Sequence, residues 1–329
     1  MSHTVTIEPD GSRFAAREDE TLLQAARRAG LVLPHECGWG SCSTCKVTLV
    51  AGETELLFPA APAISPRDAR TGRILACQSM ARSDLTIRLS PAAPPPLAVP
   101  DREQRAELVT VEELAPEIRR FTFRTEAEAA FLPGQYAILH LAPGLRRAYS
   151  MCNLPDGETL QFISKRYPGG AGSTALAALD PGAELVLEAP FGTCTLARRP
   201  GRKLFVAGGT GISPILALVR EAGRDRVDFA APVDVIYSAR RAEDLAAGDE
   251  LALAVAALPG ATYRAYVEEG AGVSGLSAGR ATDAVAASDF DPQAAEFYVA
   301  GPPVMVAAVK AQLKEAGVPI TRVHYDSFG

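Results

Sequence analysis

The feature that most constrains this chain is the spacing of its cysteines. Cys37, Cys42 and Cys45 lie within nine residues, and Cys77 follows 32 positions after the last of them. The N-terminus lacks the basic and apolar regions of a secretory signal, so we expect a cytoplasmic chain with reduced thiols. Clustered reduced thiols indicate bound metal rather than disulfides. The sequence therefore predicts a metal centre held by these four cysteines.

The spacing C-x4-C-x2-C with a distant fourth thiol is the plant-type ferredoxin pattern, which predicts a 2Fe-2S cluster. Gly38 and Gly40 allow the backbone to curl tightly around such a cluster. A structural zinc site is the alternative, but zinc ribbons usually pair two short C-x2-C knuckles. Here three ligands share one loop, which favours the cluster. Cys152 and Cys194 have no partner at ligand spacing, and we expect them to be buried packing residues.

A proline-rich segment divides the chain. Residues 91–100 contain five prolines in ten positions, and such a segment forms neither a helix interior nor a central strand. We interpret it as an extended linker between domains. The expected domains are a ferredoxin domain at 1–90, the linker at 91–102, a flavin-binding β-barrel domain at 103–200 and a nicotinamide-binding α/β domain at 201–329.

The hydrophobic patterns predict a different fold class for each domain. The first reads as a small α+β (β-grasp) unit, with a helix over 18–31 that has acidic residues in its first turn and stops at Gly30. The second shows short strand-like runs, which indicate an antiparallel barrel. In the third, strands alternate with helices, which indicates a parallel sheet.

Composition excludes two classes of partner. The net charge of -6 and the pI near 5.4 argue against general binding to nucleic acid or to an anionic membrane. No apolar run approaches the roughly 18–20 residues that span a bilayer. A bound phosphate must therefore meet local arginines or backbone amides.

Three motifs in the second domain suit a flavin: PGQY at 133–136, RAYS at 147–150 and the glycine-rich segment at 162–176. Arg147 is suited to pairing with a phosphate, and Tyr149 offers an aromatic face to a flat ring. Ser150 offers a hydroxyl to a ring nitrogen. We expect Ser173 to cap the following helix, whose N-terminus would hold a pyrophosphate.

The third domain contains two motifs suited to a nicotinamide coenzyme. VAGGTGISP at 206–214 joins a strand to a helix through three glycines, and we expect Ser213 as N-cap with Pro214 opening the helix. YVAGPPVM follows at 298–305. Ser238, Arg240 and Arg241 could accept a 2′-phosphate, which would favour NADPH. A single arginine in this context is also common in NADH-using relatives, and we favour NADH with NADPH as the alternative.

Together these motifs resemble the ferredoxin-NADP reductase superfamily. The domain order resembles the reductase components of bacterial multicomponent oxygenases, of the toluene and phenol monooxygenase or ring-hydroxylating dioxygenase type, which serve aromatic hydrocarbon catabolism. In that family a cysteine usually occupies the position of Ala300, so we expect the geometry or rate of hydride transfer to differ here. The resemblance implies flavin contacts at Arg147, Tyr149, Ser150, Ile163, Lys165, Gly170, Ser173 and Phe328, with Tyr149 and Ser150 beside flavin N5. It implies nicotinamide contacts at Gly208, Gly209, Thr210, Gly211, Ser238, Arg240, Gly301, Pro302 and Met305.

The resemblance also implies an activity. The enzyme would take hydride from NADH onto FAD and pass single electrons through the 2Fe-2S cluster to an oxygenase or hydroxylase component. FMN is the alternative flavin. We expect a monomer whose acceptor protein docks near the Cys37–Cys45 loop. Two alternatives are a non-oxygenase acceptor, as in deoxysugar synthesis, and permanent residence as an electron-transfer subunit of a larger complex.

Overall fold

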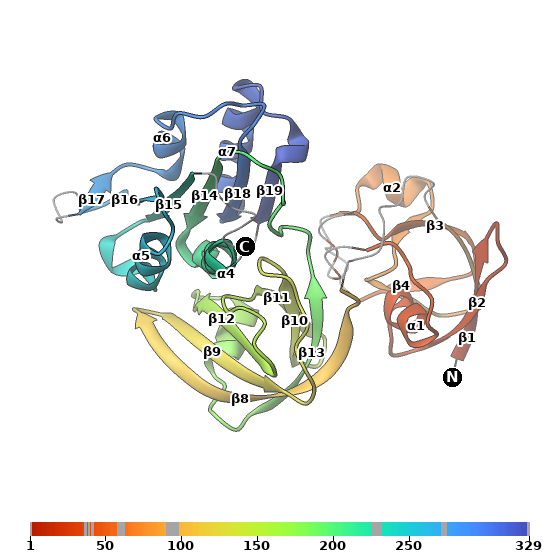
Figure 1. Ribbon diagram of the computed structural model, residues 1–329. Helices are drawn as coiled ribbons and strands as arrows, with labels where there is room; N and C mark the ends of the chain where they lie inside the picture. The colour runs from red at the N-terminus through yellow and green to blue at the C-terminus, as the bar shows by residue number, and fades with distance from the viewer. Residues whose placement is uncertain are drawn as a thin grey trace. The chain divides into compact units, whose positions relative to one another are not determined.

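The computed structural model describes residues 2–35, 38, 40, 43–57, 63–89, 99–224, 232–270 and 275–327. Its contacts divide the chain into two compact units, Met1–Asp101 and Arg102–Gly329 (Figure 1). Most of the predicted linker, 91–98, lies outside the described residues. Within the described ranges, no helix has the length and apolar composition that crossing a bilayer requires.

The first unit is a five-stranded sheet that packs against a helix. The strand order is β2-β1-β7-β3-β5, and β1 runs parallel to β7. This arrangement confirms the predicted α+β class for the first domain. The elements of the sheet are β1 (Ser2–Glu8), β2 (Arg13–Arg17), β3 (Lys46–Ala51), β5 (Arg73–Leu75) and β7 (Leu85–Arg88), with a separate pair, β4 (Thr54–Leu56) and β6 (Ser79–Ala81), and two helices, α1 (Leu22–Arg28) and α2 (Pro66–Arg70).

Helix α1 begins later than the sequence pattern suggests. Thr21 is its N-cap: Gln24 N donates to Thr21 Oγ1 (3.3 Å), and Thr21 N donates to Gln24 Oε1 (3.0 Å). This reciprocal pair satisfies two donors that a helix start otherwise leaves open. The expected acidic first turn is therefore wrong, because those residues precede the cap. Gly30, with φ +73°, follows the helix end as predicted.

The chain leaves the first unit through Asp101, which is anchored there. The side chain of Asp101 forms ion pairs with Arg27 and with His35, whose Nε2 lies 3.0 Å from Asp101 Oδ1. The other ring nitrogen of His35 lies 2.8 Å from Leu33 O. His35 therefore has structural partners at both ring nitrogens.

The first half of the second unit is a six-stranded antiparallel sheet with the order β11-β10-β13-β8-β9-β12. An isolated bridge between Met151 and Phe162 links the chain beyond β11 to β12, so the two edges of the sheet approach each other as in a barrel. Buried aromatic and aliphatic side chains fill its interior. The elements are β8 (Arg102–Ala115), β9 (Ile118–Thr125), β10 (Tyr136–Ala142), β11 (Leu145–Ser150), β12 (Thr159–Lys165), α3 (Ala171–Ala177) and β13 (Glu184–Phe191).

The second half is a six-stranded parallel sheet with the order β17-β16-β15-β14-β18-β19. Helices α4 and α5 cover one face and α6 and α7 the other, each pair over its own apolar core (Figure 1). The strand order reverses between β14 and β18, the place where such sheets bind ligands. The elements are β14 (Lys203–Gly208), α4 (Ile212–Arg224), β15 (Val233–Ala239), α5 (Gly248–Ala256), β16 (Thr262–Val267), β17 (Leu276–Ala278), α6 (Ala281–Ala286), β18 (Glu296–Gly301), α7 (Pro303–Glu315) and β19 (Val323–Ser327), with single 3-10 turns at Gly209–Gly211, Ala242–Asp244 and Ile320–Arg322.

Candidate functional site

Two of the four predicted metal ligands meet inside the first unit. Cys45 lies directly before β3, and Cys77 lies between β5 and β6; their Sγ atoms are 3.2 Å apart. Both side chains are almost fully buried. That distance is far longer than the roughly 2.05 Å of a disulfide and brings both sulfurs within reach of one metal centre. Cys37 and Cys42 lie outside the described residues.

The backbone near these thiols suits a tight loop. Gly38 and Gly40 have φ values of +66° and +100°, a region that glycine enters without steric cost. The donor set of buried soft thiolates and this curled backbone fit an iron-sulfur cluster.

The two remaining cysteines are buried packing residues, as predicted. Cys152 and Cys194 lie in the core beside α4. Burial raises the pKa of the Cys152 thiol to about 11, so this thiol is protonated at neutral pH.

Arg147 lies beside the first turn of α3. A Cβ atom on Gly172 would stand 2.5 Å from Arg147 Cγ, so the arginine stem runs directly over the helix. Among the described residues Arg147 has no carboxylate partner, and its Nη1 donates to Arg146 O (2.8 Å). Its exposed guanidinium is thus available to a phosphate.

Ser173 does not cap α3. The helix begins at Ala171 with Gly170 as N-cap, which makes no side-chain hydrogen bond. Ser173 Oγ instead accepts from Tyr167 N (3.1 Å) and donates to Gly170 O (3.2 Å). Ser173, which lies inside the helix, therefore holds the glycine-rich loop that precedes it. The prediction that Ser173 is the N-cap of this helix was wrong.

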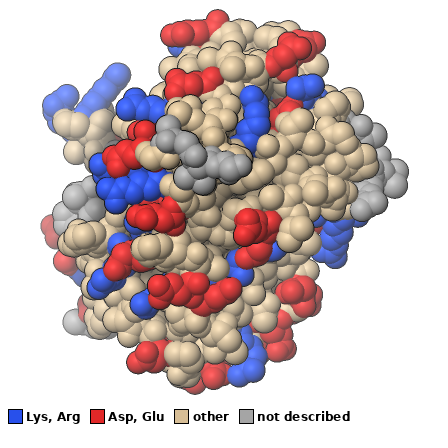
Figure 2. All heavy atoms as spheres, turned by 90° about the vertical axis from the view of Figure 1, so that its left-hand side faces the viewer, with Lys and Arg blue, Asp and Glu red and all other residues tan. Residues whose placement is uncertain are grey.

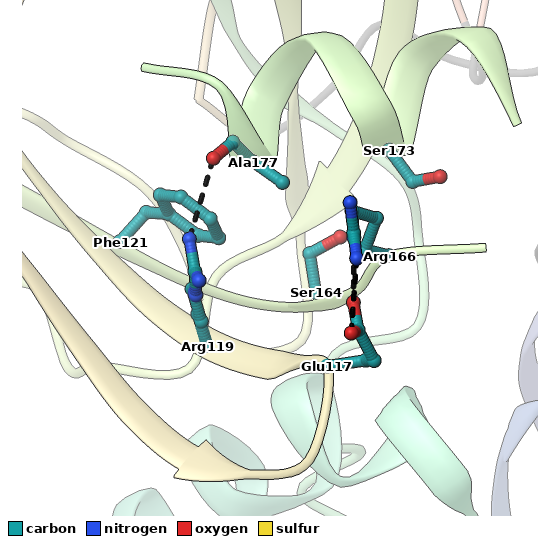
Figure 3. Close-up of a pocket in the computed structure, with 7 residues that line it drawn as sticks. All are labelled: Glu117, Arg119, Phe121, Ser164, Arg166, Ser173 and Ala177. Atoms are coloured by element: carbon teal, nitrogen blue, oxygen red, sulfur yellow. Dashed lines mark hydrogen bonds and ion pairs between the residues drawn. The ribbon is translucent and has the colours of Figure 1, made fainter. Parts of the chain in front are cut away.

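A small pocket lies on the side of α3 that faces β9 and β12 (Figure 3). Arg119 and Arg166 line it, but both guanidinium groups are engaged. Arg166 Nε donates to Glu117 Oε2 (2.5 Å), and Arg119 Nη1 donates to Ala177 O (3.3 Å). The Arg147 side of α3 is therefore the better binding site for a phosphate, because the guanidinium of Arg147 is exposed and has no carboxylate partner among the described residues.

Tyr149 and Ser150 occupy the end of β11. Burial raises the pKa of the Tyr149 phenol to about 12, so the ring is neutral at physiological pH. The tyrosine meets Phe162 edge to face, with ring centroids 6.4 Å apart. Its ring orientation is thereby fixed from the core side.

Ser150 joins the barrel to the nucleotide half. Its Oγ donates to Asp326 Oδ2 in β19, and its carbonyl oxygen accepts from Ser213 Oγ (2.6 Å). Asp326 pairs across the sheet with Ala300 of β18. Ser150, Ala300 and Asp326 thus meet where the two halves touch. The sequence analysis missed Asp326, because a single acidic residue near the chain end has no motif around it.

Ser213 has a tertiary role and is not an N-cap. Helix α4 begins at Ile212 after a 3-10 turn, so Ser213 lies inside it. Its Oγ also accepts from Ile163 N (3.4 Å). Lys165, two residues further along β12, pairs with Asp244 Oδ1 (2.6 Å). Two residues predicted to contact flavin therefore also bind the nucleotide half.

The predicted nicotinamide residues lie at the carboxyl ends of three adjacent strands. Gly208 of β14 is the register partner of Ser238 in β15, and β18 ends at Gly301 on the other side. Thr210 lies in the 3-10 turn that follows β14, and Pro302 caps α7. These motifs form one edge of the sheet, at the point where its strand order reverses.

The glycines at this edge permit close contact between the motifs. A Cβ on Gly211 would lie 2.0 Å from Ala300 O, and one on Gly208 would lie 2.4 Å from Met305 Sδ. A side chain at Gly211 would collide with the end of β18, and one at Gly208 would collide with the start of α7. Arg240 follows β15 and pairs with Glu269. Phe328 lies outside the described residues.

Comparisons with known proteins match all three parts. Residues 5–82 match the 2Fe-2S iron-sulfur cluster binding domain, 105–196 the oxidoreductase FAD-binding domain and 205–311 the oxidoreductase NAD-binding domain. The chain is 38% identical over 326 residues to the ferredoxin–NAD(+) reductase component of the alkene monooxygenase system of Xanthobacter autotrophicus, covering 97% of this chain and 98% of that one. It belongs to this family of iron-sulfur flavoprotein reductases.

Other relatives agree. The propane 2-monooxygenase reductase component of Mycolicibacterium goodii is 34% identical over 346 residues, which cover 99% of this chain and 97% of that one. A solved ferredoxin reductase of carbazole 1,9a-dioxygenase superposes with a TM-score of 0.85 at 31% identity, over 100% of this chain and 99% of that one. The predicted fold classes and their order are thereby confirmed.

Family membership also settles the cofactors. The reductase carries a 2Fe-2S cluster and FAD and uses a nicotinamide coenzyme, which excludes the zinc and FMN alternatives. It is an oxidoreductase that passes electrons from NAD(P)H through flavin to the iron-sulfur centre.

Proposed function

We propose that this reductase is the electron-supplying component of a hydrocarbon monooxygenase system and that NADH is its donor. The observation that carries the proposal is the end-to-end match, at 38% and 34% identity, to the reductase components of alkene and propane 2-monooxygenase systems. When bound, the nicotinamide supplies electrons in pairs, the flavin accepts a pair and releases single electrons, and the cluster passes them on singly.

We assign the flavin phosphate to Arg147 and the flavin ring to Tyr149 and Ser150. The arginine is exposed and has no carboxylate partner among the described residues. The tyrosine ring is held by Phe162. Ser150 lies next to Asp326, which comes from the nucleotide half. These contacts support a flavin ring located between the two halves, beside the nicotinamide edge of the parallel sheet.

Asp326 acts in this scheme as a positioning residue. By accepting a hydrogen bond from Ser150 Oγ, its carboxylate fixes the serine rotamer and leaves the lone pairs of Oγ directed away from β19. A fixed hydroxyl lowers the cost of ordering the reacting groups before electron transfer.

Replacing either partner should slow flavin reduction. We expect Asp326→Asn and Ser150→Ala to lower the limiting rate of flavin bleaching by NADH about 10- to 100-fold, with a much smaller change in the half-saturating NADH concentration. Stopped-flow absorbance measures both quantities. Asp289→Asn is the matched control, since Asp289 is an exposed aspartate distant in sequence from the site. If the two site variants bleach at the wild-type rate, Ser150 and Asp326 have no such role.

We propose that the acceptor docks over the segment 37–45. Three of the four predicted cluster ligands lie in this segment, so an acceptor bound there has the shortest path to the iron. We further propose that the reductase is a cytoplasmic protein and that it works as a monomer. Light scattering of the purified protein tests the monomeric state.

Reconstitution tests the choice of partner. The reductase is mixed with purified hydroxylase components of an alkene or propane monooxygenase and, separately, with a ring-hydroxylating dioxygenase. We expect NADH-dependent product formation at least about tenfold faster with a monooxygenase hydroxylase. A dioxygenase that is served equally well or better contradicts the proposal.

A further inference from the structure

Two arginines follow β15, and one acidic side chain holds both of them. Glu269 lies two residues beyond the end of β16, and its backbone nitrogen donates to Arg240 O (2.8 Å). The preceding Glu268 N donates to Ala239 O (3.3 Å). These main-chain bonds hold the loop after β16 beside the end of β15.

The carboxylate of Glu269 bridges the two guanidinium groups. Arg240 Nε donates to Glu269 Oε1 (2.7 Å), and Arg241 Nε donates to Glu269 Oε2 (3.0 Å). The two arginines hold the pKa of the Glu269 carboxyl below its usual range, so it is ionised at neutral pH. Glu243 adds a second carboxylate 3.6 Å from Arg241.

The cluster of Arg240, Arg241 and Glu269 lies at the edge of the sheet where the adenosine of a dinucleotide binds. In open parallel sheets a dinucleotide binds outside the carboxyl ends of the strands at the reversal of strand order, and the ribose 2′ position is read just beyond the neighbouring strand. Here the order reverses beside β14, and β15 is its neighbour on the side away from β18. Arg240 and Arg241 therefore occupy the positions that would meet a 2′-phosphate.

The charge around these arginines opposes a 2′-phosphate. A phosphate monoester carries between one and two negative charges near neutral pH, and on binding these arginines it would come close to the Glu269 carboxylate that already contacts both of them. Each exposed ion pair contributes little to stability, but like charges in contact discriminate strongly between ligands. Figure 2 shows the side of the molecule that includes the β17 edge of this sheet, where acidic and basic side chains are intermixed.

We propose that Glu269 is the specificity-determining residue that makes this reductase prefer NADH over NADPH. Its carboxylate occupies the two guanidinium groups and repels a 2′-phosphate, whereas the uncharged 2′-hydroxyl of NADH meets no such repulsion. The inference rests on the proposed function only in taking NADH as the donor. It assigns the choice between NADH and NADPH to Glu269, which follows β16. Arg240 and Arg241 by themselves do not decide that choice.

Binding of coenzyme fragments tests the proposal without turnover. Isothermal titration calorimetry measures the Kd of adenosine 2′,5′-bisphosphate and of 5′-AMP for the purified holoenzyme. We expect Glu269→Gln to tighten the bisphosphate at least about tenfold relative to AMP, and this gain should shrink as salt rises from 50 to about 500 mM. The ratio of kcat/KM for NADPH to that for NADH should rise by a similar factor.

Glu268→Gln is the matched control. Glu268 is the neighbouring residue on the same loop, it is also exposed, and its described partner is Arg280 (3.4 Å), not Arg240 or Arg241. This variant removes the same charge and should leave both ratios within about twofold of wild type. Adding Arg240→Ala and Arg241→Ala to Glu269→Gln should abolish the gain.

Three results would overturn the inference. They are a wild-type protein that prefers NADPH, equal gains in the Glu268 and Glu269 variants, and unchanged ratios in Glu269→Gln. A wild-type preference for NADPH would also overturn NADH as the donor, whereas the other two results would leave the proposed supply of electrons to a monooxygenase untouched. Failure of that supply would appear as the absence of hydrocarbon oxidation with any monooxygenase partner, whichever coenzyme is bound.

Discussion

Replacing Cys77 with serine is expected to remove the 2Fe-2S cluster and to leave the flavin in place. Cys77 is buried, and its Sγ lies 3.2 Å from that of Cys45, so its thiolate is close enough to share one metal centre with that of Cys45. A serine hydroxyl is a harder and less acidic donor than a thiol. We expect cytochrome c reduction by NADH to fall more than about 100-fold, while reduction of ferricyanide, which takes electrons directly from flavin, remains.

The control for this experiment is Cys152→Ala, which changes a buried cysteine of the second unit. This variant should keep the visible absorbance and the electron spin resonance signal of the cluster. FAD content is measured in both variants, because it reports the integrity of the second unit independently. A Cys77→Ser protein with the wild-type spin signal would show that Cys77 is not a ligand.

Replacing Arg147 with alanine is expected to weaken FAD binding about 100-fold. The guanidinium is exposed, has no carboxylate partner among the described residues and lies over the first turn of α3. A charge-assisted pair with a phosphate is therefore available to it at little cost. Fluorescence titration of the FAD-depleted protein with FAD measures the affinity.

Two further variants sharpen this experiment. Gly172→Val should also weaken FAD binding, because its Cβ would stand 2.5 Å from Arg147 Cγ and would displace the arginine. Arg124→Ala is the matched control, since Arg124 is an exposed arginine on β9 paired with Glu107. If the Arg147→Ala variant binds FAD as tightly as the Arg124→Ala variant does, Arg147 does not bind the flavin phosphate.

Most of the fold could be predicted because its signals are local. The thiol spacing, the proline-rich segment and the change from short strands to alternating strands and helices each depend on residues near one another in sequence. All three predicted fold classes are confirmed. The individual flavin and nicotinamide contacts stay predictions, although the structure brings Gly208, Gly211, Gly301 and Met305 together at one edge.

The errors arose where tertiary contacts decide what a side chain does. Ser173 and Ser213 each lie near a helix start, and the local pattern favours an N-cap for both. Ser213 Oγ instead bonds Ser150 O and Ile163 N, 63 and 50 positions away. The contact between Ser150 and Asp326 spans 176 positions. No local pattern encodes such distant partners.

The central claim is that electrons pass from the nicotinamide through flavin to the iron-sulfur centre of one chain. Anaerobic titration with NADH, followed by visible absorbance and electron spin resonance, tests it most directly. We predict that the flavin bleaches and the spin signal of a reduced 2Fe-2S cluster develops, with an end point of about 1.5 NADH per chain, because flavin takes two electrons and the cluster one. Bleaching without any cluster signal, or an end point without flavin bleaching, would contradict the account.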